Sequence, residues 1–323
     1  MTERVDAVRT AFRRRLAIDR RTLAAFRVAL ALVVLVDLAR RFPDAGAFYT
    51  DGGVLPRSVL ASLSPSYAAV SLHALSGALV VQLALFALAA AAALALLVGY
   101  RTRLAVVVTL VLLVSIQLRN PFVLNSGDVL LRRLLFWASF LPLGSRWAVD
   151  AADADERDSV VGLATAGLVA QVIAVYATNA VVKLRADVWL RGDAVRYAFQ
   201  LDHFTILLGN VLAGWSPALR LAGWAWLCLL VCSPLLVALT GRARAALVGA
   251  FAAFHAGMVV TMQLGVFPLV SLVGLVPLLP GPVWDWLETR LPTLRGLPRV
   301  PRTPLAKRVP ALSTAARTFA ACC

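Results

Sequence analysis

The fold is decided by residues 159–183, SVVGLATAGLVAQVIAVYATNAVVK, in which 24 uncharged residues from Ser159 to Val182 precede Lys183. About 20 consecutive apolar residues are enough for a helix to cross a bilayer. Lys183 would then lie where the apolar helix meets the membrane interface. The stretch therefore predicts a transmembrane helix that carries its first charge at one end.

The whole chain has the composition of a membrane protein. Hydrophobic residues make up 60% of its 323 residues, charged residues only 15%, and the mean hydropathy is +0.81. A soluble domain of this length has too small an interior to bury so much apolar side chain. We therefore expect an all-α polytopic membrane protein.

Further apolar runs predict about eight transmembrane helices, two of them short or re-entrant. The third segment has only 15 residues, and the fourth carries Arg132 and Arg133 near its start. The last run of 40 uncharged residues is long enough for two helices with a turn at Phe267-Pro268. The predicted segments are 23–38, 78–98, 104–118, the apolar part after Asp128 as far as Leu143, 159–182, 221–240 and the two halves of 245–284.

Basic residues predict the orientation. With eight spans, twenty Lys and Arg fall on the side of the two termini, nine on the other side and three within spans. Cytoplasmic segments carry the excess of basic residues, so we expect both termini in the cytoplasm and Lys183 on the outer side of the cell membrane. The predicted parts are a basic cytoplasmic arm (1–22), a transmembrane domain (23–281) and a Pro/Arg-rich cytoplasmic tail (282–323).

The net charge of +15 comes mostly from those two flanks. Basic residues beside a transmembrane helix are typical of contact with anionic lipid headgroups, so we expect membrane lipids as partners and no nucleic acid. The cysteines and histidines form no cluster with metal-ligand spacing, and we expect no metal.

Lys183 is the first candidate for chemistry. On a helix, Asn179 lies one turn before it and Tyr176 two turns before it, so the three residues share one face. Desolvation at this boundary favours the neutral amine, which can act as a base. The alternative is a lysine that only extends its charge to the membrane surface.

Asp187 lies four residues after Lys183 and would pair with it on a continuous helix. A paired lysine keeps its proton and cannot act as a base at neutral pH. We therefore expect the helix to break between Lys183 and Trp189, with Asp187 turned toward Arg185 or Arg191.

The segment 119–128 places polar residues, among them Asn125 and Asp128, between two apolar runs. Asp128 precedes Arg132 by four residues, the favourable acid-then-base spacing on a helix. Arginines inside an apolar stretch are costly unless they are paired, so we expect an ion pair between Asp128 and Arg132. The segment is either a plain loop or the entrance to a site.

His255 lies inside the run 245–284, where its ring must find a hydrogen-bond partner. Two interpretations are open. The residue is either a neutral histidine that bridges two helices or part of a functional site.

Four motifs together resemble the HTTM family, which includes the membrane domain of the vitamin K-dependent γ-carboxylases and their prokaryotic relatives. The pattern Tyr-x6-Lys-Leu-x4-Trp-x2-Gly at 176–192 is similar to the segment that carries the catalytic lysine in those enzymes. The other three are Phe-Tyr-Thr-Asp-Gly-Gly-Val-Leu-Pro at 48–56, Asp-Val-Leu-Leu-Arg-Arg-Leu-Leu-Phe-Trp at 128–137, and His255 followed by Gly-Val-Phe-Pro at 265–268. The resemblance covers roughly residues 20–280.

The resemblance implies a γ-carboxylase-like membrane domain with Lys183 and His255 as catalytic residues. In the carboxylases a lysine deprotonates reduced vitamin K, oxygen adds to it, and the product removes a proton from a glutamyl side chain, which then captures CO2. The implied cofactor is a reduced lipid quinone, and the implied substrate is a small or protein carboxylate. The implied binding residues for substrate or quinone are Tyr176, Asn179, Trp189, Asn125, Asp128 and Arg132.

The chain departs from the animal carboxylases in two respects. Leu-Asn-Ser-Gly-Asp at 124–128 stands where those enzymes have Asn-Asn-His-Ser, and no large soluble region follows the last predicted span, which favours a smaller substrate. Two functions are therefore open: a γ-carboxylase-like enzyme, and a non-catalytic lipid- or quinone-binding protein or assembly partner. A transporter lacks support because the sequence shows no internal repeat.

Overall fold

The computed structural model describes residues 10–11, 13–151 and 159–291, which are almost entirely α-helical. Within them, five helices are long and apolar enough to cross a membrane, so the predicted all-α membrane class is confirmed and the protein is an integral, multi-pass membrane protein. These helices are α2 (Arg20–Arg41), α6 (Leu79–Val98), α7 (Thr102–Arg119), α9 (Leu163–Leu184) and α15 (Gly241–Thr261).

Three shorter helices complete the bundle. They are α8 (Ser126–Ala138), α13 (Ser216–Val231) and α16 (Phe267–Leu275), which continues through η3 (Val276–Leu278). After η3 the chain turns by 102° into α17 (Gly281–Arg290), so this bent pair counts as a sixth span at most. The larger number of about eight spans stays a prediction.

Short elements connect these helices. β1 (Ile18–Asp19) and β2 (Ser159–Val160) form a two-residue antiparallel pair that ties the start of α2 to the start of α9. The remaining elements are α3 (Ala45–Tyr49), α4 (Arg57–Leu63), α5 (Pro65–Val70), η1 (Leu72–Ala74), η2 (Pro121–Val123), α10 (Asp187–Leu190), α11 (Asp193–Ala198), α12 (Leu208–Leu212) and α14 (Leu235–Ala238).

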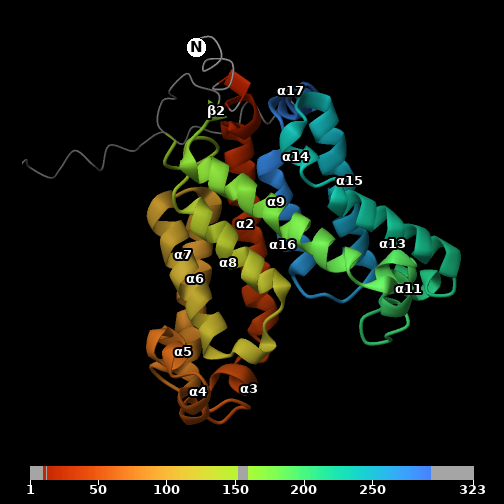
Figure 1. Ribbon diagram of the computed structural model, residues 1–323. Helices are drawn as coiled ribbons and strands as arrows, with labels where there is room; N and C mark the ends of the chain where they lie inside the picture. Colours follow the sequence, from red (N-terminus) through yellow and green to blue (C-terminus); the bar gives the residue numbers. More distant parts are fainter. Residues whose placement is uncertain (1–9, 12, 152–158, 292–323) are drawn as a thin grey trace, which may run out of the picture.

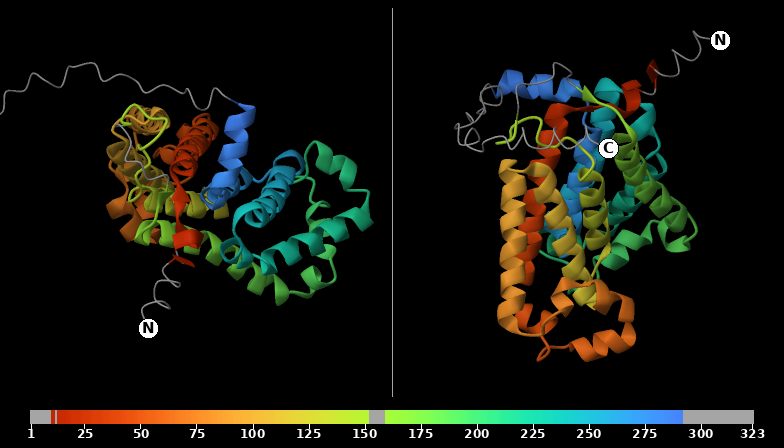
Figure 2. Two further views of the ribbon diagram at one scale, coloured as in Figure 1. Left: turned by 90° about the horizontal axis from the view of Figure 1, so that it is seen from above. Right: turned by 90° about the vertical axis from the view of Figure 1, so that its left-hand side faces the viewer.

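The helices form two groups that meet at α9 and α16 (Figure 1). In the first group α2 packs on α6, α6 on α7 and α7 on α8, with α3, α4 and α5 at one end and β2 at the other. The second group contains α11, α13 and α15, which is packed on α16. The view from above shows α13 and α15 set apart from the first group (Figure 2).

The core of the first group follows from the spacing of apolar residues on α2. Leu23, Phe26, Leu30 and Val34 recur every three or four residues and are completely buried against neighbouring helices. Because α16 also packs on α2 and on α8, the two groups share one continuous apolar interior.

Several predicted boundaries shift. The third apolar segment forms the 18-residue helix α7, whereas the fourth is short, at 13 residues in α8. The last apolar run turns at 262–266 rather than at Phe267-Pro268, because Pro268 occupies the first turn of α16, where no backbone donor is needed. The predicted tail begins with α17, while residues 1–9 of the arm and 292–323 of the tail lie outside the described residues.

Candidate functional site

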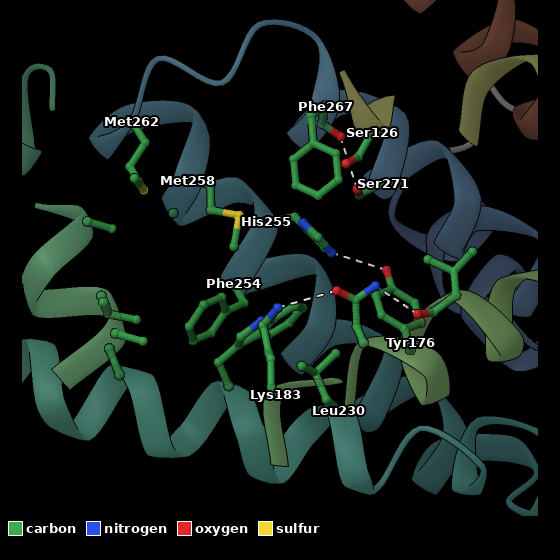
Figure 3. A pocket seen from close by; sticks show the side chains of 18 of the residues that line it. Ser126, Tyr176, Lys183, Leu230, Phe254, His255, Met258, Met262, Phe267 and Ser271 are labelled. Carbon is green, nitrogen blue, oxygen red and sulfur yellow. Dashed lines mark hydrogen bonds between the residues drawn. The ribbon is translucent and has the colours of Figure 1, made fainter. Parts of the chain in front are cut away.

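A cavity of about 810 Å³ lies between α8, α9, α13, α15 and α16 (Figure 3). Its lining is mostly apolar and aromatic, as expected of a site for an apolar ligand. The structure brings together at this cavity five of the eight predicted site residues: Tyr176, Asn179, Lys183, Trp189 and His255.

Lys183 lies in the last turn of α9 and is partly buried. Its Nζ donates a hydrogen bond to Asn179 Oδ1 at 3.3 Å and lies 4.6 Å from the centre of the Trp189 ring. Asn179 is itself held by a 2.9 Å hydrogen bond to the carbonyl of Val175. The amide oxygen and the aromatic face stabilise a cation, whereas the apolar lining favours the neutral amine.

The predicted helix break after Lys183 is confirmed. α9 ends at Leu184, and α10 begins at Asp187, whose exposed side chain lies in the first turn of that short helix. Within the described residues Asp187 forms no ion pair with Lys183, and none with Arg185 or Arg191, so the predicted arginine partner is wrong.

His255 on α15 and Tyr176 on α9 form the second polar pair of the cavity. The Tyr176 hydroxyl and His255 Nε2 are 3.1 Å apart, and both side chains are buried. This hydrogen bond joins two helices, as one of the two interpretations of His255 predicts. The other ring nitrogen, Nδ1, is buried and has no hydrogen-bond partner within the described residues, so it is available to a ligand.

Aromatic rings form the wall around this pair. Trp226 stacks on Phe254 with ring centres 4.5 Å apart, and Tyr176 packs against Phe251 at 4.6 Å. Phe267 lies edge-on to His255 at 6.1 Å. These contacts fix the positions of the two polar side chains and keep the surroundings apolar.

The predicted ion pair between Asp128 and Arg132 is wrong. Asp128 is fully buried and pairs with Arg41 of α2, which also binds Asp37 at 2.8 Å and the Tyr49 hydroxyl at 2.9 Å. The reason is local, because Asp128 stands in the first turn of α8 and its side chain turns back to accept the Asn125 N–H at 2.7 Å. That direction leads toward α2 and away from Arg132.

Three predicted binding residues do not line the cavity: Asn125, Asp128 and Arg132. Asn125 caps α8, with its side chain accepting the N–H of Gly127 at 2.7 Å. Asp128 completes that cap and holds Arg41. The structure therefore gives Asn125 and Asp128 roles in fixing the start of α8, which is the helix that forms one wall of the cavity.

The loop motif at 48–56 is built into the fold at the end that carries α3, α4 and α5. Arg119 is fully buried and donates to the carbonyls of Leu55 at 2.8 Å and Thr50 at 3.2 Å. Asp51 pairs with Arg57 at 2.8 Å, and these hydrogen bonds lower the pKa of the Asp51 carboxyl. The motif thus shapes this loop and does not reach the cavity.

Several residues that line the cavity were not predicted from the sequence, among them Ser126, Arg133, Gln171 and Trp226. For α8 the signal was present, because Ser126, Val129 and Arg133 recur at helical spacing on one face. The Trp226 side had no such signal, since a tryptophan inside an apolar run is normally part of the core.

Comparison with known proteins identifies the family. The HTTM domain matches residues 16–284, which include the five long apolar helices and the entire lining of the cavity. No curated protein and no solved structure matches the chain. Since the match covers most of the sequence, the resemblance drawn from the four motifs is confirmed, and the chain belongs to the HTTM domain family.

Proposed function

We propose that the cavity binds an apolar ligand with an acidic hydroxyl group, such as a reduced lipid quinone, and that Lys183 removes its proton. The observation that carries the proposal is an amine at the wall of an apolar cavity, without a carboxylate partner in the described part of the chain. Family membership supports it, because HTTM domains occur in vitamin K-dependent carboxylases.

The surrounding residues suit Lys183 to this task. The apolar lining favours the neutral amine, whose lone pair accepts the proton. Once the ammonium has formed, Asn179 Oδ1 and the Trp189 ring stabilise it, because both attract a cation. The same two contacts hold Nζ in one position before the transfer.

The cavity fits a reduced quinone by its chemistry. The lining is apolar, and a buried polar atom of the lining, His255 Nδ1, lacks a partner among the described residues. His255, fixed by Tyr176, is positioned to hydrogen-bond a ligand oxygen. A bound quinol would supply the acidic hydroxyl and the electrons for reaction with dioxygen. Carboxylation of a small or protein carboxylate is the further step that the family suggests.

A second candidate function is non-catalytic binding of a lipid or quinone. It is favoured by the contacts of Lys183 itself, because Asn179 and Trp189 stabilise the charged form that cannot act as a base. In this alternative the same cavity binds the same class of ligand, but the protein does not convert the ligand to a product.

Replacing Lys183 with methionine should separate the two functions. We expect Lys183→Met to slow the oxygen-dependent oxidation of reduced menaquinone-4 about 100-fold, which is typical for loss of a general base. The measurement uses the full chain in nanodiscs and follows the absorbance of the quinone, with protein-free nanodiscs as the background.

The matched control is Arg185→Met, which removes an exposed cation two residues further on that does not line the cavity. Its oxidation rate should equal that of the unmodified protein. Equal slowing in both variants would show that Lys183 is not the base. Saturable quinone binding without oxidation above background would show that the protein binds the ligand without catalysis and would rule out the enzyme function.

We also propose that both termini are cytoplasmic, on the strength of the twenty-to-nine basic asymmetry. In a background without other cysteines, Asp202→Cys should react with a membrane-impermeant maleimide on intact cells. Thr289→Cys on α17 should react only after permeabilisation, and both positions are exposed. Labelling of both from the same side, or the reverse pattern, would refute this orientation.

A further inference from the structure

The cavity has a second polar region, remote from Lys183. The lining residues of α9 lie on two stripes, each with helical spacing. One stripe carries Lys183, the proposed base. The other stripe begins one residue earlier in the chain and faces α8. The first stripe is Val172, Tyr176, Asn179 and Lys183, and the second is Gln171, Ala174, Val175 and Thr178.

Arg133 of α8 lies level with Gln171 of α9. The two helices pack together, and the Trp137 ring occupies the space beside Gly167, where an added Cβ would come within 2.2 Å of it. Arg133 is one turn before Trp137, and Gln171 is one turn after Gly167. α8 and α9 run in opposite directions past this contact, so Arg133 and Gln171 lie on the same side of it. Together they mark one end of the cavity.

Arg133 needs an anionic partner that the described residues do not provide. It is exposed at the cavity, in the middle of the amphipathic helix α8, and forms no ion pair with any residue of 10–11, 13–151 or 159–291. An unpaired charge within a membrane domain is costly, and such charges usually face a cavity or a ligand. Among the described residues, the lining contains no aspartate or glutamate that could neutralise it.

Gln171 supplies a second donor at the same end. Its Nε2 is buried without a hydrogen-bond partner in the described part of the chain. A guanidinium beside an amide N–H₂ suits an oxyanion such as a carboxylate or a phosphate. From Gln171 to Lys183 the helix rises roughly 18 Å, which is somewhat more than half the ~30 Å hydrocarbon thickness of a bilayer. The lining residues of α9 therefore extend over about the length of one acyl chain.

We propose that the cavity takes a single-chain amphiphile whose anionic headgroup binds Arg133 and Gln171 and whose apolar chain extends along α9 toward Lys183. This inference goes beyond the proposed function, because it concerns the opposite end of the cavity and requires no proton transfer. The exposed residues Ala174 and Thr178 place the ligand's path between α8 and α9, where a lipid can reach it from the membrane.

The test compares an acid with its uncharged analogue. The protein is placed in nanodiscs of neutral phosphatidylcholine, and binding of 9,10-dibromostearate and of the corresponding dibromo alcohol is followed by bromine quenching of tryptophan fluorescence. Trp189 and Trp226 both line the cavity and serve as reporters. We expect the acid to bind about tenfold more tightly than the alcohol, and a brominated lysophosphatidate arm distinguishes a phosphate headgroup from a carboxylate.

Two arginine variants decide the headgroup position. Arg133→Gln should abolish the preference for the acid and leave binding of the alcohol unchanged. Arg132→Gln, the matched control at the adjacent position outside the lining, should preserve that preference. The proposal is overturned if the unmodified protein binds acid and alcohol equally, if both variants lose the preference equally, or if Lys183→Met alone removes it. None of these readouts depends on quinol oxidation, so failure here leaves the proposed function to its own test.

Discussion

Arg41→Met is expected to destabilise the protein by about 4 kcal/mol, the cost of breaking a buried ionic cluster by removing one partner. Arg41 stands between two buried carboxylates, Asp37 and Asp128, and also binds the Tyr49 hydroxyl. Without the guanidinium, two negative groups would remain close together in an apolar interior. The start of α8 would lose its tie to α2, since Asp128 is both a capping residue and the partner of Arg41.

The measurement is thermal unfolding in detergent, with Arg40→Met as the matched control. Arg40 is the preceding residue on α2, and its side chain is exposed, so its replacement should change stability by less than about 1 kcal/mol. Asp128→Asn should be milder than Arg41→Met, because Asp37 still neutralises the arginine. Comparable melting temperatures for Arg41→Met and Arg40→Met would show that the cluster does not contribute to stability.

The partner of Asp128 in the Arg41 cluster could not be predicted from the sequence. Four-residue spacing within one helix suggested Arg132 as the partner of Asp128, whereas the actual partner lies 87 residues earlier on another helix. Local spacing states which groups can meet within a helix, but not which neighbouring helix packs against it. A second local pattern favoured a capping role for Asp128 over a pair with Arg132, because an acid three residues after an asparagine is typical of a helix start.

The helices and the centre of the cavity were predictable for a physical reason. The backbone N–H and C=O groups of a long uncharged run can all be hydrogen-bonded within a bilayer only if the run forms a helix. One face of that helix then brings Tyr176, Asn179 and Lys183 together. The family resemblance implied His255 as a site residue, and the structure places it at the cavity, hydrogen-bonded to Tyr176. Arg133 was missed because its role depends on how α8 and α9 pack, which composition and spacing do not specify.

His73 carries the largest expected pH effect outside the membrane-spanning helices. It lies in η1 and is only 1% exposed, with its backbone N–H donating to Ser115 Oγ at 3.0 Å and its Nδ1 2.8 Å from the same oxygen. Its Nε2 is buried without a partner among the described residues. Burial, and secondly the nearby charge of Arg119, lower the pKa of His73 from 6.5 to about 4.

Because the pKa of His73 is lower in the folded state, the neutral ring contributes its full stabilisation above pH 6.5. This stabilisation is lost as the pH falls from 6.5 toward 4, by on the order of 3 kcal/mol in total. Thermal unfolding in detergent between about pH 7.5 and 4.5 should therefore show a steeper loss of stability than in His73→Asn. The asparagine amide can replace the bond to Ser115 but does not titrate, and all other groups, including His255, are the same in both proteins. Equal slopes would mean that His73 takes up its proton in the folded state at its ordinary pKa, and that the polar contacts around η1 open readily to water.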